Sequence, residues 1–197
     1  LNPWDGKDEI PGKAADGAKA LIDELHSALD PKAYRKAVAL LAESEFIDIF
    51  GVENSLTPAM DLFTKLGYLG LTCRLNTDAY LQQIGAGHLP HGAVAVAFSH
   101  SGSSADTVKA LRLAKSHGAK TIAITNAIGA PLASWADVTL LTGRDSHTIY
   151  GNAIFSRVAD TALVDMLYMG VILSGYGRFS TALDESGRMI RDRVFEN

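Results

Sequence analysis

A run of hydroxyl-bearing residues stands directly after an apolar stretch of the chain. The six residues Ser99-His100-Ser101-Gly102-Ser103-Ser104 follow Phe98 and precede a helical pattern that ends at Gly118. Serine hydroxyls, a glycine and the free backbone N–H groups of a helix start are groups that bind phosphate. The run lacks the Gly-Lys-Ser/Thr sequence of a nucleotide P-loop and the three spaced glycines of a dinucleotide turn. These residues therefore predict a site for a small phosphorylated ligand.

The same serines also have an ordinary structural interpretation. Serine is a common helix N-cap, so Ser103 or Ser104 can cap the following helix while the other residues form a flexible turn. Both interpretations fit the sequence.

A second polar loop, Gly51-Val52-Glu53-Asn54-Ser55, follows the first apolar strand pattern. In parallel sheets, ligands collect at the carboxyl ends of the strands, where the strand order reverses. We expect this loop to lie beside Ser99–Ser104, so that Asn54 and Ser55 share the ligand. Taken alone, a glycine after a strand and Thr57-Pro58 at a helix start are ordinary turn and cap chemistry.

Strand, loop and helix patterns alternate through the centre of the chain. The expected strands cover residues 46–50, 69–75, 93–98, 121–125 and 138–142, and helical patterns follow at 58–66, 80–84, 105–117 and 131–136. A strand such as Ala93–Phe98 is apolar throughout, which is typical of a parallel sheet buried on both faces. The predicted fold is a three-layer α/β/α sandwich with a five-stranded parallel sheet.

The remaining residues are assigned to a linker and to flanking helices. Residues 1–12 are rich in Pro, Gly and Asp and have the composition of a linker. Residues 13–197 then form one domain, with a sheet core at about 46–142 and flanking helices at 13–43 and 152–195. A chain of 197 residues with 47% hydrophobic content is large enough for one such core.

Composition excludes several classes of function. The net charge is −4 and there is no run of Lys or Arg, so the chain alone is not expected to bind DNA. Cys73 is the only cysteine, which excludes an internal disulfide and indicates a reducing, cytoplasmic setting. The apolar stretch 163–173 is short and broken by Asp165 and Gly170, so no membrane span is expected. No metal and no cofactor is predicted.

Together, the two loops resemble those of the sugar-isomerase (SIS) family, in which a Gly-x-Gly-x-Ser loop and a Ser-x-Ser-Gly-x-Ser/Thr loop hold a phosphosugar. The likeness continues through 118–126 and 131–137 and covers roughly residues 46–142. The resemblance implies a flavodoxin-like strand order and a sugar phosphate as ligand. The implied ligand-binding residues are Asn54, Ser55, Ser99, His100, Ser101, Gly102, Ser103 and Ser104.

The flanking segments are similar to those of RpiR/MurR-type transcriptional regulators. The similarity lies in the N-terminal helical pair, in Ser156-Arg157-Val158-Ala159 and in residues 163–167. This resemblance implies an effector-binding (sensor) domain that contacts DNA only through an N-terminal helix-turn-helix domain missing from this chain. It also implies a homodimer or homotetramer formed through the flanking helices.

The alternative function is a stand-alone aldose-ketose isomerase of sugar phosphates. That reaction needs a carboxylate or histidine base near the carbon next to the carbonyl. Glu53 and His100 are weak catalytic candidates. Glu53 can instead be a solvated loop carboxylate, and the His100 side chain can point away while its backbone N–H contacts the ligand. Further candidates are Asp160, Asp165 and a His26 that enters a neighbouring subunit. Because no base stands out, binding without turnover is favoured; a domain with a vestigial site is a third alternative.

One residue departs from the SIS pattern. Glu53 stands where the family usually has a small residue. A carboxylate near a phosphate repels it unless the carboxylate turns outward or bonds to sugar hydroxyls. The identity of the sugar is therefore left open by the sequence.

Overall fold

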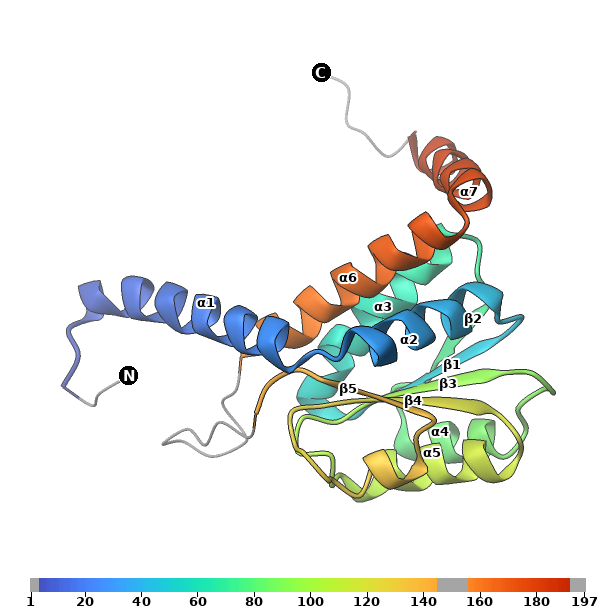
Figure 1. The fold of residues 1–197 in the computed structure, drawn as a ribbon, viewed down its shortest axis with the longest axis horizontal. Coiled ribbons are helices and arrows are strands. Elements are labelled where there is room, and N and C mark those ends of the chain that lie inside the picture. The colour runs from blue at the N-terminus through green and yellow to red at the C-terminus, as the bar shows by residue number, and fades with distance from the viewer. Residues whose placement is uncertain (1–3, 145–155, 192–197) are drawn as a thin grey trace.

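A computed structural model describes residues 4–144 and 156–191 of the chain (Figure 1). Parts of the expected C-terminal helices, residues 152–155 and 192–195, lie outside the described residues. The elements in chain order are η1 (Lys7–Glu9), α1 (Ile10–Ala28), α2 (Pro31–Glu43), β1 (Ile47–Phe50), η2 (Glu53–Ser55), α3 (Leu56–Tyr68), β2 (Cys73–Leu75), α4 (Ala79–Ala86), β3 (Val94–Phe98), α5 (Ala105–Ser116), β4 (Lys120–Thr125), η3 (Ala133–Trp135), β5 (Val138–Leu141), α6 (Val158–Ser174) and α7 (Tyr176–Met189).

The five strands form one parallel sheet in the order β2-β1-β3-β4-β5. On β1, Ile47 is in register with Cys73 of β2 on one side and with Val94 of β3 on the other. All the carboxyl ends therefore meet at one edge of the sheet, and the strand order reverses between β1 and β3. This arrangement confirms the predicted α/β/α fold and its flavodoxin-like order, and it places the two polar loops next to each other.

Helices cover both faces of the sheet, with α1, α2, α3 and α6 on one side and α4 and α5 on the other (Figure 1). Side chains alternate along β3: Val94, Val96 and Phe98 pack into the core under α2, α3 and α6, whereas Ala95 and Ala97 face α5. Small side chains on the α5 face allow this helix to lie close to the strand. The loop Ser99–Ser104, the candidate phosphate site, connects β3 to α5.

Several expected boundaries differ in the structure. The strand expected at 69–75 is shorter, because β2 covers only Cys73–Leu75. Helix α1 begins at Ile10 rather than Lys13, with Pro11 in its first turn, where proline is tolerated. The prediction of a helix at 131–136 is wrong, because only the 3-10 turn η3 forms there. The hydroxyl of Thr121 donates to the Trp135 carbonyl at 2.8 Å and the Asp137 N–H donates to the Thr121 carbonyl at 2.9 Å. These bonds draw the chain into β5 and end the turn.

Within the described residues, no single helix is long and apolar enough to cross a membrane. Helices α6 and α7 together meet the length and composition of a span, but they are bent by 116° where they join.

Candidate ligand-binding site

The loop after β3 is held at both ends by backbone hydrogen bonds. The Ser99 N–H donates to the Ile124 carbonyl at 3.0 Å, and the His100 carbonyl accepts from the Asn126 N–H at 3.0 Å. Further along, the Gly102 carbonyl accepts from the Leu132 N–H at 2.9 Å. The loop is thus fixed against β4 and the segment that follows β4, which presets the direction of its serines.

Gly102 has a structural role within this loop. Its φ is +62°, in the left-handed region, and an added Cβ would lie 2.3 Å from the Ala130 Cβ and 2.8 Å from the Thr125 hydroxyl. Both the backbone angle and the contact exclude a side chain. Gly102 therefore sets the backbone conformation of the loop. It is not one of the residues that line the pocket.

The serines before α5 do not cap the helix with their side chains. Ser104 occupies the N-cap position without a side-chain cap, and its hydroxyl instead accepts from the Thr107 hydroxyl at 3.3 Å. The Ser103 hydroxyl is exposed and donates to the Ser101 hydroxyl at 3.1 Å. The capping interpretation is therefore wrong for this structure, and the first-turn N–H groups of α5 have no serine cap to occupy them.

The loop after β1 is held by a buried side chain from α4. Gln82 is 1% exposed; its amide nitrogen donates to the Gly51 carbonyl at 2.7 Å, and its amide oxygen accepts from the Gly51 N–H at 3.3 Å. Beyond Gly51, Glu53 adopts a φ of +52° and is the one non-glycine residue in the described ranges with a positive φ. A left-handed conformation costs an L-residue about 1–2 kcal/mol relative to its usual backbone.

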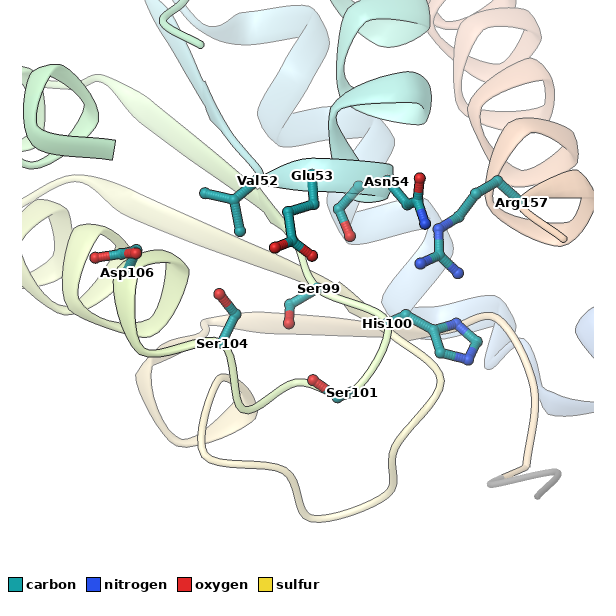
Figure 2. A pocket seen from close by; sticks show the side chains of 10 residues that line it. Val52, Glu53, Asn54, Ser99, His100, Ser101, Ser104, Asp106 and Arg157 are labelled. Carbon is teal, nitrogen blue, oxygen red and sulfur yellow. The ribbon is translucent and has the colours of Figure 1, made fainter. Parts of the chain in front are cut away.

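The two loops and the start of α6 enclose a pocket of about 310 Å³ (Figure 2). Of the predicted ligand-binding residues, six line it: Asn54, Ser55, Ser99, His100, Ser101 and Ser104. The structure brings these together from two loops that are about 45 residues apart in the chain. Gly102 and Ser103, also predicted, are outside the lining.

Three lining residues were missed from the sequence: Val52, Asp106 and Arg157. Asp106 lies in the first turn of α5 and accepts from the Gln83 amide nitrogen at 3.1 Å. Arg157 directly precedes α6 and reaches the pocket from the far end of the chain; in Figure 2 it lies next to Asn54, above His100. Its Nε and Nη1 are buried and have no hydrogen-bond partner within the described residues. In the sequence, Arg157 appeared only within the Ser156-Arg157-Val158-Ala159 segment that resembles RpiR/MurR-type regulators. That resemblance assigned no role to Arg157.

The candidate bases separate into two groups. Glu53 and His100 line the pocket, so either is close to a bound ligand. Asp165 instead forms an ion pair with Lys65 of α3 at 2.5 Å, and His26 lies exposed on α1, outside the lining. Asp160 is 5% exposed, and burial raises its pKa to about 6, against the opposing effects of Arg157 and a Thr142 hydrogen bond. Asp160 is also outside the lining.

No metal centre is formed by the part of the chain that the structure describes. Within residues 4–144 and 156–191, no three His, Cys, Asp or Glu side chains come together as candidate ligands. The pocket chemistry in these ranges comes from hydroxyls, amides, two carboxylates, a guanidinium and an imidazole.

Comparison with known proteins places this chain in a wider group. The chain is 30% identical over 185 residues to the HTH-type transcriptional regulator TTE0211 of Caldanaerobacter subterraneus subsp. tengcongensis, covering 94% of this chain and 66% of that protein. The chain thus spans just under two thirds of that relative's length.

Solved structures share the fold. The Vibrio vulnificus NanR protein complexed with ManNAc-6P superposes with a TM-score of 0.89 at 24% identity, over 96% of this chain and 72% of that one. The sugar isomerase domain of the RpiR transcription factor from Sphaerobacter thermophilus superposes with a TM-score of 0.83 at 22% identity, over 91% of this chain and 99% of that one. The SIS domain family itself matches residues 40–170, which include both loops and Arg157. This chain therefore belongs to the SIS domain family.

Proposed function

We propose that this chain is the sugar-phosphate-sensing domain of an RpiR-type transcriptional regulator. The pocket carries the proposal: serine hydroxyls and the N-terminus of α5 meet there at the carboxyl edge of a parallel sheet. In the proposed complex, Ser99, Ser101, Ser104 and Ser55 donate to the phosphate, and Asn54 and His100 contact the sugar. Charge-assisted hydrogen bonds to a phosphate are each worth roughly 1.5–3 kcal/mol, so the loop needs no lysine.

Relatives support the regulatory part of the proposal. The regulator TTE0211 is longer than this chain, and NanR was solved with a sugar phosphate, ManNAc-6P. By analogy, the complete protein has a helix-turn-helix domain that contacts DNA, works in the cytoplasm, and forms a homodimer or homotetramer. Ligand binding then shifts the domain, or its assembly, between two arrangements that place the DNA-binding domains differently.

Ligand binding is tested by calorimetry and thermal unfolding with a panel of sugar phosphates and the matching free sugars. At a hundred times Kd, a ligand stabilises the folded state by about 2.7 kcal/mol, which corresponds to a rise in Tm of roughly 5–10 °C for a chain of this size. Free sugars should give no comparable shift.

The variant Ser101→Ala tests the assignment of the loop. Loss of one hydroxyl donor should raise Kd about 10-fold to 100-fold, with Tm of the free protein little changed. Ser116→Ala is the control, because the Ser116 hydroxyl donates to the Leu113 carbonyl at the opposite end of α5. Equal affinities for the two variants would contradict the loop assignment.

An isomerase remains the second candidate function, because Glu53 and His100 both line the pocket. A carboxylate base would remove the proton from the carbon next to the sugar carbonyl and return it to the neighbouring carbon. Exchange of solvent deuterium into a bound sugar phosphate, lost in Glu53→Gln, would establish this activity. Binding without exchange across the panel would favour the sensor.

A further inference from the structure

Glu53 occupies a left-handed backbone conformation, which favours glycine. It lies at the start of η2 with a φ of +52°. Residues with strained backbone angles cluster at active sites and ligand-binding sites, where the strain accompanies a functional role. Here the side chain leads into the pocket: in Figure 2 the Glu53 carboxylate points from the β1 loop toward Ser99 and Ser104.

The charged side chains that line the pocket include more carboxylates than guanidinium groups. Two carboxylates, Glu53 and Asp106, and a single guanidinium, that of Arg157, line the pocket. Asp106 is held by the Gln83 amide, whereas Glu53 has no ion pair within the described residues. A phosphate dianion on the serine loop would lie near this uncompensated carboxylate and be repelled by it.

A ligand that carries its own positive charge removes this conflict. An ammonium group on the sugar can pair with the Glu53 carboxylate while the phosphate of the same molecule occupies the serine loop and the N-terminus of α5. A neutral sugar hydroxyl at the same place can donate a hydrogen bond but leaves the carboxylate charge uncompensated. An acetylated amine likewise donates without supplying charge.

We propose that the pocket selects an amino sugar phosphate with a free, protonated amine, and that Glu53 is the specificity-determining residue that binds the amine. This assignment rests on the proposed function, because it presumes that the serine loop holds a sugar phosphate. It adds the chemical class of the sugar, which the loops themselves do not define.

The test compares matched ligands by calorimetry at pH 7 and fixed ionic strength. Each set contains the amino sugar phosphate, its N-acetyl derivative and the corresponding hydroxyl sugar phosphate, in the glucose, mannose and galactose series. The wild-type chain should bind the free-amine member of at least one set about tenfold or more tightly than the other two members.

Variants identify the residue responsible. Glu53→Gln keeps the size of the side chain and one acceptor oxygen but removes the charge. The preference for the free amine should therefore disappear, while binding of the hydroxyl member is unchanged or tighter. The control is Glu45→Gln, since Glu45 is exposed and lies before β1, at the opposite edge of the sheet. This control should keep the wild-type preference.

The outcomes separate the two proposals. If sugar phosphates bind but no set shows a free-amine preference, or if Glu53→Gln retains that preference, the inference on Glu53 is wrong while the sensing function stands. If no sugar phosphate binds at all, both are wrong. Loss of the preference in Glu53→Gln alone supports the inference.

Discussion

Gly102 illustrates how a single residue can set the geometry of a whole loop. Its left-handed backbone and its approach to Ala130 and Thr125 both exclude a side chain. Gly102→Ala should therefore lower the free energy of unfolding by roughly 2–5 kcal/mol, the sum of backbone strain and overpacking. Gly92→Ala is the matched control, because Gly92 has a φ of +79° but nothing within 4 Å of an added Cβ. It should cost only about 1–2 kcal/mol in urea unfolding; equal losses would show that the contact is unimportant.

Asp160 gives a prediction for pH dependence. Its pKa is raised to about 6 from the 3.8 of an unperturbed aspartate, so the folded state holds the proton more tightly than the unfolded state does. The associated stability is therefore present below the unfolded pKa and is lost as the pH rises through 6. Asp160→Asn cannot ionise, and its gain in unfolding free energy should be about 2 kcal/mol larger at pH 8 than at pH 4.5.

The control for that measurement lies on the same helix. Asp165 is more exposed and paired with Lys65, so Asp165→Asn should not reproduce the pH-dependent gain. Chemical unfolding of the wild type and both variants at the two pH values provides the comparison. A gain for Asp160→Asn that is the same at both pH values would contradict the burial of an ionised carboxylate.

At the residue scale, the sequence predicted those site residues that lie close together in the chain. The serines of one loop and Asn54-Ser55 of the other follow strands directly, so residue type and position were enough to predict them. Arg157 comes from the start of α6, far along the chain, and the packing of α6 against α2 and α3 brings it to the pocket. The left-handed backbone conformation of Glu53 also could not be predicted from the sequence, because residue type alone does not predict a positive φ for glutamate.

At the scale of elements, apolar runs predicted five strands of a parallel sheet, because a strand buried on both faces is apolar throughout. The order of the strands was implied by the family resemblance. The prediction of a helix at 131–136 failed because it rested on local composition. Hydrogen bonds of Thr121 with Trp135 and Asp137 hold this segment in another conformation. Local propensity is weak against such tertiary bonds.

The contact between α2 and α6 yields an element-scale prediction. Gly170 on α6 lies against α2, where an added Cβ would be 2.5 Å from the Tyr34 hydroxyl and 2.7 Å from a Val38 methyl. That hydroxyl also donates to the Met166 carbonyl at 2.6 Å. Gly170→Ala should force the helices apart and lower the free energy of unfolding by about 1–3 kcal/mol, despite the better helix propensity of alanine.

Gly17→Ala on α1 is the matched control, since Gly17 is exposed in a helix and has nothing within 4 Å of an added Cβ. Propensity alone acts there, and the substitution should raise the free energy of unfolding by about 0.5–1 kcal/mol. Opposite signs for the two variants in thermal and urea unfolding are the expected result. A stabilising Gly170→Ala would mean that α2 and α6 are less closely packed than described.

At the scale of the whole molecule, the proposed sensor must connect its pocket to DNA that the acidic chain is not expected to bind. The pocket spans the loops of β1 and β3 and the start of α6, and α6 packs against α1 and α2, the helices at the N-terminal side of the domain (Figure 1). A ligand that contacts both Ser101 and Arg157 therefore bridges the sheet edge and the helical layer. This gives a physical route by which occupancy can alter the position of α1, which leads toward the N-terminus.

Linkage makes this proposal quantitative in the complete gene product. If a sugar phosphate changes the affinity for DNA by a given factor, DNA must change the affinity for the sugar phosphate by the same factor, typically about 5-fold to 150-fold. Anisotropy titrations of DNA from upstream of the gene, with and without saturating ligand, give one factor, and calorimetry with and without DNA gives the other. Arg157→Gln should reduce both factors together, whereas Ser101→Ala should raise the ligand concentration required but leave the factor at saturation unchanged. A ligand that saturates the site without altering DNA affinity would overturn the sensor and leave the isomerase as the function to pursue.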